Sequence, residues 1–169
     1  FGFDKPQERY AVILYGRQFE LTRDFYRAYC SNSVSGAQLI LRTLLEAGVD
    51  LSNLCDDADY AKNMDANDLK EWLRIAREAG RGGNPFLSML SDSAEFTTQA
   101  EEWHSDLERL KDEDRPPLSA EKRFRRADMT DIYRSVYNSL CGYSHNTIRA
   151  LTDRHVTITD EAVTITLSK

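Results

Sequence analysis

The residues with the clearest chemical potential lie in one stretch of the last third of the chain. Arg134, Tyr137, Asn138, Cys141 and His145 follow one another at steps of three and four residues, which places them on one broad side of a helix. An imidazole takes up or releases a proton near neutral pH, so His145 is a candidate general acid or base. A core histidine held by its neighbours is the alternative interpretation. We take Tyr137, Arg134, Asn138 and Cys141 as candidate binding residues.

A second candidate pair lies earlier, on the most apolar helical pattern. Arg42 and Glu46 are one helical turn apart. A buried arginine keeps its charge and requires a carboxylate, whereas an exposed pair contributes little to stability. If the pair is buried, we expect Arg42, Glu46 and His145 to converge inside the protein, with His145 held by a hydrogen bond from a residue such as Tyr137. These three are the candidate catalytic residues.

The sequence predicts no metal site and no cofactor. Cys141 and His145 have the spacing of two ligands on one helix, but no second pair of ligands accompanies them. The glycine-rich segment 80–85 lacks the Gly-Lys-Ser/Thr sequence of a phosphate-binding loop and is interpreted as a turn. One basic cluster has two interpretations, phosphate contacts or a solvated helix face: Lys122, Arg123, Arg125 and Arg126.

Hydrophobic periodicity predicts the helices that position these residues. In the first helix, an apolar stripe is formed by Val12, Tyr15, Phe19, Tyr26 and Tyr29. The helices expected in order are 6–30, 37–61, 65–80, one that begins at Ser91 or Ser93 and reaches Leu110, a short basic helix after Ser119, and one from Thr130 to Leu151.

The C-terminal segment changes to an alternation of apolar residues and threonine, which is typical of strands. We predict a β-hairpin over 155–168 that turns at Asp160 and Glu161, in which Val156 faces Ile165, Ile158 faces Val163, and Thr157 faces Thr164. One face of this hairpin is apolar up to Leu167, so we expect it to cover the helices or to pair with a twin in a homodimer.

Length and composition predict the fold class. With 169 residues, a hydrophobic content of 41% and a net charge of −6, the chain is expected to form one mainly α-helical domain over 1–169. We expect a bundle of about five helices with the C-terminal hairpin. The acidic balance argues against a surface that grips nucleic acid throughout. The residues expected in the core are Leu44, Ala47, Trp72, Phe96, Val136, Leu140 and Ile148.

Three cysteines without paired spacing indicate a reducing compartment, so we expect a cytoplasmic protein. No run of 18 apolar residues is present, and we expect no membrane association. The chain begins at Phe1 without a signal peptide, and we expect it to be trimmed from a longer chain.

The motifs Arg42-x3-Glu46 and Tyr137-x2-Leu140, followed by His145, resemble those of a large bacterial family of uncharacterised helical proteins, often encoded near phage-defence genes. The resemblance spans about 12–151 and implies a helical bundle in which Arg42, Glu46 and His145 converge. That family is similar in turn to HEPN domains, many of which are ribonucleases with an Arg-x4–6-His motif. Arg149 and His155 have this spacing.

Two hypotheses for function follow. The first is a helical module that binds a protein partner or a small ligand. The alternative is a HEPN-like, metal-independent ribonuclease or toxin that acts on RNA through His145 or through Arg149 and His155. Whether the protein is an enzyme is left open at this point.

Overall fold

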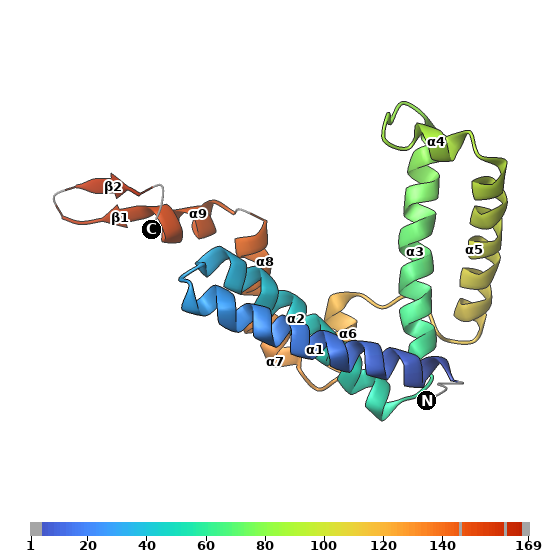
Figure 1. Cartoon of the computed structure of the whole chain (residues 1–169), viewed down its shortest axis with the longest axis horizontal. Coiled ribbons are helices and arrows are strands. Elements are labelled where there is room, and N and C mark those ends of the chain that lie inside the picture. The colour runs from blue at the N-terminus through green and yellow to red at the C-terminus, as the bar shows by residue number, and fades with distance from the viewer. Residues whose placement is uncertain (1–4, 146, 161, 167–169) are drawn as a thin grey trace. The chain divides into compact units, whose positions relative to one another are not determined.

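The computed structural model describes residues 5–145, 147–160 and 162–166. It is mainly helical and ends in a small antiparallel hairpin (Figure 1). More helical segments are present than the five expected. The helices are α1 (Pro6–Cys30), α2 (Val34–Asp56), α3 (Tyr60–Arg81), α4 (Ser88–Ser91), α5 (Ala94–Asp112), α6 (Ala120–Arg126), α7 (Thr130–Ile132), the π-helix η1 (Tyr133–Tyr137), α8 (Asn138–Ser144) and α9 (Ile148–His155). The strands are β1 (Val156–Ile158) and β2 (Val163–Ile165).

The chain forms two compact units. One contains 53–122 and the beginning of α1 up to Tyr10, and the other contains 11–52 and the chain from Arg123 onward. The single domain 1–169 expected from the sequence stays a prediction.

The first unit is built on α3 and α5, which run side by side (Figure 1). Ala66 of α3 and Leu107 and Leu110 of α5 form its buried core. The rings of Trp72 and Trp103 extend this contact with centroids 5.3 Å apart. The loop after α5 is fastened by polar contacts to α3: Asn63 donates to the carbonyl of Pro116 at 2.9 Å, and Asn67 accepts from the amide of Leu118 at 3.0 Å.

The second unit contains the helical hairpin of α1 and α2 and the segments from α6 to β2. Gln18 of α1 donates to the carbonyl of Leu44 of α2 at 3.2 Å. Phe124 of α6 is fully buried, and its ring lies 5.5 Å from that of Tyr133 and 4.7 Å from that of Tyr137. The aromatic rings therefore join α6 to the π-helix.

The hairpin has the register predicted from the alternation: Val156 pairs with Ile165, Thr157 with Thr164, and Ile158 with Val163. Its apolar face does not cover the helices, because the side chains of β2 and of Ile158 are exposed. Pairing with a twin stays a prediction. Glu161 of the expected turn and Leu167 of the expected face lie outside the described residues.

Several predicted helix boundaries were wrong for local reasons. The helix expected over 37–61 ends at Asp56, where the side chain of Asp57 accepts from the amide of Asp59 at 2.9 Å and forms a turn. The next helix therefore begins at Tyr60, before Asp65, and continues one residue past Gly80. The helix expected over 130–151 stops at Ser144, because Thr147 caps a new helix by accepting from the amide of Ala150 at 3.3 Å.

The expected core was partly wrong. Ala47 and Leu140 are buried, and Leu44 and Phe96 are half-buried. Trp72, Val136 and Ile148 are exposed. For Ile148 the cause is the break before α9, since a helical period cannot be carried across a break. Val136 lies in the π-helix, whose wider turn departs from the 3.6-residue period and buries Tyr137 instead.

Candidate functional site

Three of the residues singled out by the sequence meet in a polar cluster of the second unit. Arg42 of α2 pairs with Oε1 of Glu46 at 3.1 Å. The hydroxyl of Tyr137 donates to the same Oε1 at 2.8 Å and accepts from Nη2 of Arg42 at 3.4 Å. The contact joins α2 to the π-helix across 91 positions of sequence.

The second carboxylate oxygen of Glu46 extends the cluster to α6. Arg123 approaches it at 3.4 Å and pairs more closely with Asp50, at 2.7 Å. The side chains of Arg42 and Glu46 are 31% and 27% exposed, whereas those of Arg123 and Asp50 are 17% and 16% exposed. The pair on α2 is therefore partly buried, between the two alternatives that the sequence left open.

The charges of the cluster are held firmly. The hydrogen bond with Tyr137 raises the pKa of Arg42 above its ordinary range, against the opposing effect of burial, and a hydrogen bond with Cys141 adds to the rise. Burial raises the pKa of Tyr137 to about 12. Near neutral pH the arginine stays charged and the phenol stays protonated, so neither group exchanges protons. The cluster can hold α2, α6 and η1 together, but Arg42 and Tyr137 are unsuited to acid–base chemistry.

Of the remaining residues of the predicted site, Cys141 contacts Arg42 of this cluster, whereas His145, Arg134 and Asn138 do not share a hydrogen bond with it within the described residues. His145 follows α8 and is exposed, and no hydrogen bond joins its ring to Arg42, Glu46 or Tyr137 within the described part of the chain. Arg134 and Asn138 are exposed, while Tyr137 between them is buried. The five residues from Arg134 to His145 therefore do not share one buried side.

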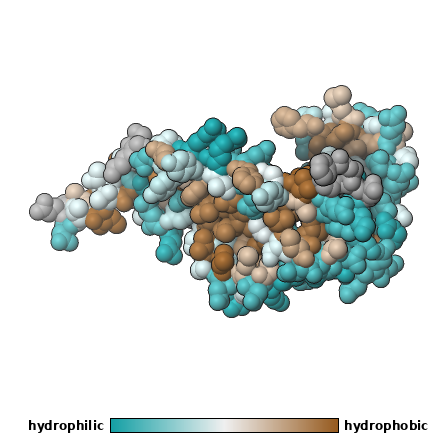
Figure 2. All heavy atoms as spheres, turned by 60° about the horizontal axis from the view of Figure 1, so that its bottom comes forward, coloured by the Kyte–Doolittle hydropathy of each residue, from teal (hydrophilic) through white to brown (hydrophobic). Residues whose placement is uncertain are grey.

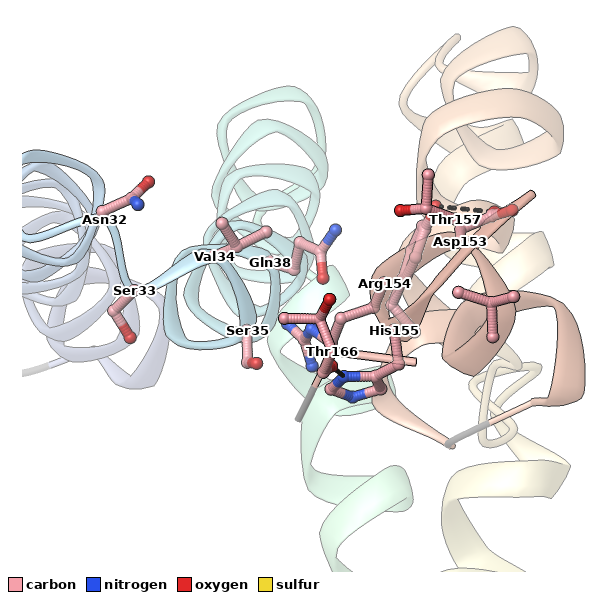
Figure 3. Close-up of a pocket in the computed structure, with 12 residues that line it drawn as sticks. Asn32, Ser33, Val34, Ser35, Gln38, Asp153, Arg154, His155, Thr157 and Thr166 are labelled. Carbon is pink, nitrogen blue, oxygen red and sulfur yellow. Dashed lines mark hydrogen bonds between the residues drawn. The ribbon is translucent and has the colours of Figure 1, made fainter. Parts of the chain in front are cut away.

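A polar pocket of about 890 Å³ lies where the start of α2 meets α9 and the hairpin (Figure 3). Ser33, Ser35 and Gln38 line it from one side, and Arg154 and His155 from the other. Nδ1 of His155 lies 2.9 Å from the carbonyl oxygen of Thr166. A carbonyl only accepts, so Nδ1 carries the hydrogen and the Nε2 of a neutral ring keeps its lone pair.

The sequence placed His155 at the start of a strand, and its position as the last residue of α9 was not predicted. Its hydrogen-bond partner belongs to the returning end of the hairpin, so the alternating pattern was the available signal. Arg149, at the other end of α9, has a side chain that is 92% exposed and lies 4.0 Å from Asp153. Arg149 does not line the pocket.

The apolar stripe that the sequence showed on α1 is exposed, which the sequence did not reveal. An apolar stripe normally faces a protein core, but here five large side chains are 49% to 71% exposed: Val12, Tyr15, Phe19, Tyr26 and Tyr29. A different stripe is the one turned inward, and it consists of smaller or half-buried residues around Leu21: Ala11, Leu14, Gln18, Phe25 and Ala28. Figure 2 shows hydrophobic residues gathered in the middle of the face that it presents. The residues of the inward stripe also follow steps of three and four residues, so the sequence of α1 carries two helical stripes. This second stripe was the available signal that the aromatic one could be exposed.

Within the described residues, no three side chains of the types that bind metals gather to form a metal site. None of the described helices has the length and apolar character needed to cross a bilayer. All three cysteines are free thiols, and Cys30 and Cys55 are exposed on their helices.

These features define the chain as a helical protein with a small β-hairpin, a polar cluster and an exposed apolar helix face. The chain belongs to a family of unknown function, DUF5677, whose pattern it matches over residues 8–162. Comparisons with curated proteins and with solved structures found no match.

Proposed function

We propose that this protein is an interaction module that binds a helix of a partner protein on the exposed stripe of α1. The observation that carries the proposal is the exposure of Val12, Phe19 and Tyr26 along one line of a regular 25-residue helix. Scattered apolar residues are ordinary on a surface, whereas a contiguous apolar stripe marks an interaction site.

The spacing of the stripe specifies a helix as the ligand. Its residues follow steps of three and four, which correspond to positions a and d of a heptad, with Thr22 at the remaining d position. Two helices that carry such a seam bury it against each other. From Val12 to Tyr29 the seam measures about 26 Å, which matches between four and five turns of a partner helix. The resemblance would set this interaction in bacterial phage defence, and the cysteine content would set it in the cytoplasm.

Site-specific photocrosslinking tests the proposal. A photoreactive phenylalanine analogue replaces Phe19 in one variant and Ile13 in the control, and crosslinks are formed in the cells that produce the protein. Ile13 has the same 64% exposure on the same helix but lies off the seam. We expect one discrete adduct from position 19, identified by mass spectrometry, and none from position 13. The purified partner should then lose at least about tenfold in affinity for Phe19→Glu and not for Ile13→Glu. Equal labelling at both positions, or none, would overturn the proposal.

A second candidate function is supported by the His155 pocket. The bond to Thr166 leaves Nε2 of the neutral ring as a proton acceptor, and Arg154 supplies positive charge in the same pocket. An oriented imidazole beside a guanidinium suits cleavage of RNA without a metal. The imidazole takes the proton of the 2′-hydroxyl as that oxygen bonds to phosphorus, and the arginine stabilises the phosphorane. The bond from phosphorus to the 5′-oxygen then breaks, and the imidazolium returns the proton to the departing 5′-oxygen. The RNA-cleaving alternative therefore rests on His155 rather than on His145 or on the polar cluster.

Cleavage of a labelled single-stranded RNA by the purified protein in a chelator tests this second candidate. His155→Ala should reduce the rate at least about 100-fold, because general acid–base catalysis contributes about that much or more. His145→Ala is the matched control and should leave the rate within about twofold. An inactive wild-type protein, or equal loss in the two variants, would rule out His155 as a catalytic residue.

A further inference from the structure

We infer that the partner on α1 is α1 of a second copy of this chain, bound antiparallel; this inference rests on the proposed function and names its ligand. The order of residues along the seam and the area that the seam exposes both favour this partner. Each of these is a property of the described residues of α1.

The order of residues on the seam is complementary to itself in the antiparallel direction. With a twofold axis between Phe19 and Thr22, Val12 faces Tyr29 of the other copy, and Tyr15 faces Tyr26. Each of these layers joins an a position to a d position, as antiparallel helix pairs require. A small side chain faces a large one in the outer layers and again at Phe19 and Thr22, and only the layers of Tyr15 and Tyr26 join two large side chains.

A parallel pair would pack the seam less evenly. Each residue would face its own copy, so Phe19, Tyr26 and Tyr29 would form crowded layers and Thr22 would leave a gap. Cavities and overpacked layers both destabilise a packed interface. The composition of the seam therefore favours the antiparallel arrangement.

The exposed area is sufficient for a dimer. Four aromatic side chains and one valine, each half to two-thirds exposed, present roughly 600 Å² per copy. Two copies would bury roughly 1,200 Å², which lies within the range of specific protein interfaces. A partner smaller than a long helix would leave part of this area in water.

The charged residues of α1 do not interrupt the seam. Glu20 and Arg23 lie outside it and are engaged with Arg17 and Asp24 of their own helix, at 3.1 Å and 3.3 Å. The layers of the pair therefore place no charged side chain against the other copy.

Sedimentation equilibrium of the full chain tests whether this pair forms. We expect a dimer for the wild type and for Ile13→Glu, and a monomer for Phe19→Glu, because a carboxylate in the central layer has no partner. Circular dichroism on each variant verifies that α1 stays folded. A wild-type monomer at 100 µM, on the order of a weak dimer's dissociation constant, would overturn the inference.

Disulfide trapping tests the direction of the pair. In a chain with its three native cysteines replaced by serine, Tyr15→Cys and Tyr26→Cys are prepared separately and then mixed. The antiparallel pair predicts crosslinks in the mixture at least about tenfold faster than in either variant alone. Faster crosslinking of each variant with itself would overturn the antiparallel arrangement. If position 19 crosslinks to a different protein in cells and the wild type is a monomer in solution, the proposed helix-binding function stands and the second-copy inference is wrong. If position 19 forms no crosslinked adduct at all, both the proposed function and this inference are wrong.

Discussion

The hydroxyl of Tyr137 donates a 2.8 Å hydrogen bond to the carboxylate of Glu46, and this bond joins the π-helix to α2. The same carboxylate pairs with Arg42 and faces Arg123, so one glutamate serves three elements of the second unit. Both Arg42 and Tyr137 keep their protons near neutral pH, so their contacts with Glu46 suit the positioning of helices.

Replacement of Glu46 tests this role. Glu46→Gln should lower the free energy of unfolding by about 1–2 kcal/mol, a loss between those of exposed and buried charge pairs. The loss is intermediate because the site is partly buried and because the amide of glutamine still accepts one hydrogen bond. Urea denaturation measures the loss. Glu20→Gln is the control, since the Arg17–Glu20 pair is 50% and 58% exposed and should contribute less than about 0.5 kcal/mol. Equal losses for the two variants would show that Glu46 lies in water.

The stability of the protein should fall in alkali through Tyr137. Its pKa rises from 10.0 to about 12 on folding, so its neutral form is held by the folded state. This contribution is complete below pH 10 and is lost as the pH rises from 10 to 12. Tyr137→Phe should therefore make the free energy of unfolding less dependent on pH in this window. An unchanged pH dependence would contradict the hydrogen-bonded arrangement.

Tyr10 of the first unit offers a parallel measurement. Burial and its hydrogen bond to Asp65 raise the pKa of Tyr10 to about 12. Tyr10→Phe should flatten the same alkaline window by a similar amount, because it also removes a phenol whose proton is retained on folding. The double variant should show the sum of the two effects in chemical denaturation at pH 10, 11 and 12. A double variant no flatter than either single one would mean that one of the two hydrogen bonds is not formed.

The C-terminal hairpin should contribute little to the stability of a single copy. Ile158, Val163 and Ile165 are 66% to 71% exposed, so little apolar area returns to water when the chain is cut after His155. We expect a loss below about 1 kcal/mol by urea denaturation, compared with about 2–5 kcal/mol for Leu140→Ala in the buried core. A truncated protein as unstable as Leu140→Ala would show that the apolar face of the hairpin is covered.

The start of α5 depends on one serine. The Oγ of Ser93 accepts from the amide of Phe96 at 3.2 Å, so Ser93→Ala should cost about 1 kcal/mol. Ser91→Ala is the matched control, because the hydroxyl of Ser91 donates to a carbonyl of the short α4 and does not cap α5. Thermal denaturation of both variants compares them. A larger loss at Ser91 than at Ser93 would contradict this cap.

Local patterns in the sequence determined the features that depend on residues close together in the chain. The bounds of α1 and the register of Val156 with Ile165 were predicted, and Ser93 was one of the two serines predicted to begin α5. These features follow from capping hydrogen bonds and from periods of 3.6 and 2 residues, which neighbouring residues set among themselves.

The tertiary structure alone decided which side of each helix is buried. The aromatic stripe of α1 is the more hydrophobic one, yet the stripe around Leu21 faces α2 and leaves Phe19 in water. In the same way, the tertiary structure brings Glu46 into contact with Tyr137 and not with His145. It also places the carbonyl of Thr166 where it orients the ring of His155. A helix with two seams satisfies its own backbone whichever seam is covered, so the choice rests on the shape and polarity of distant segments, which no local spacing encodes.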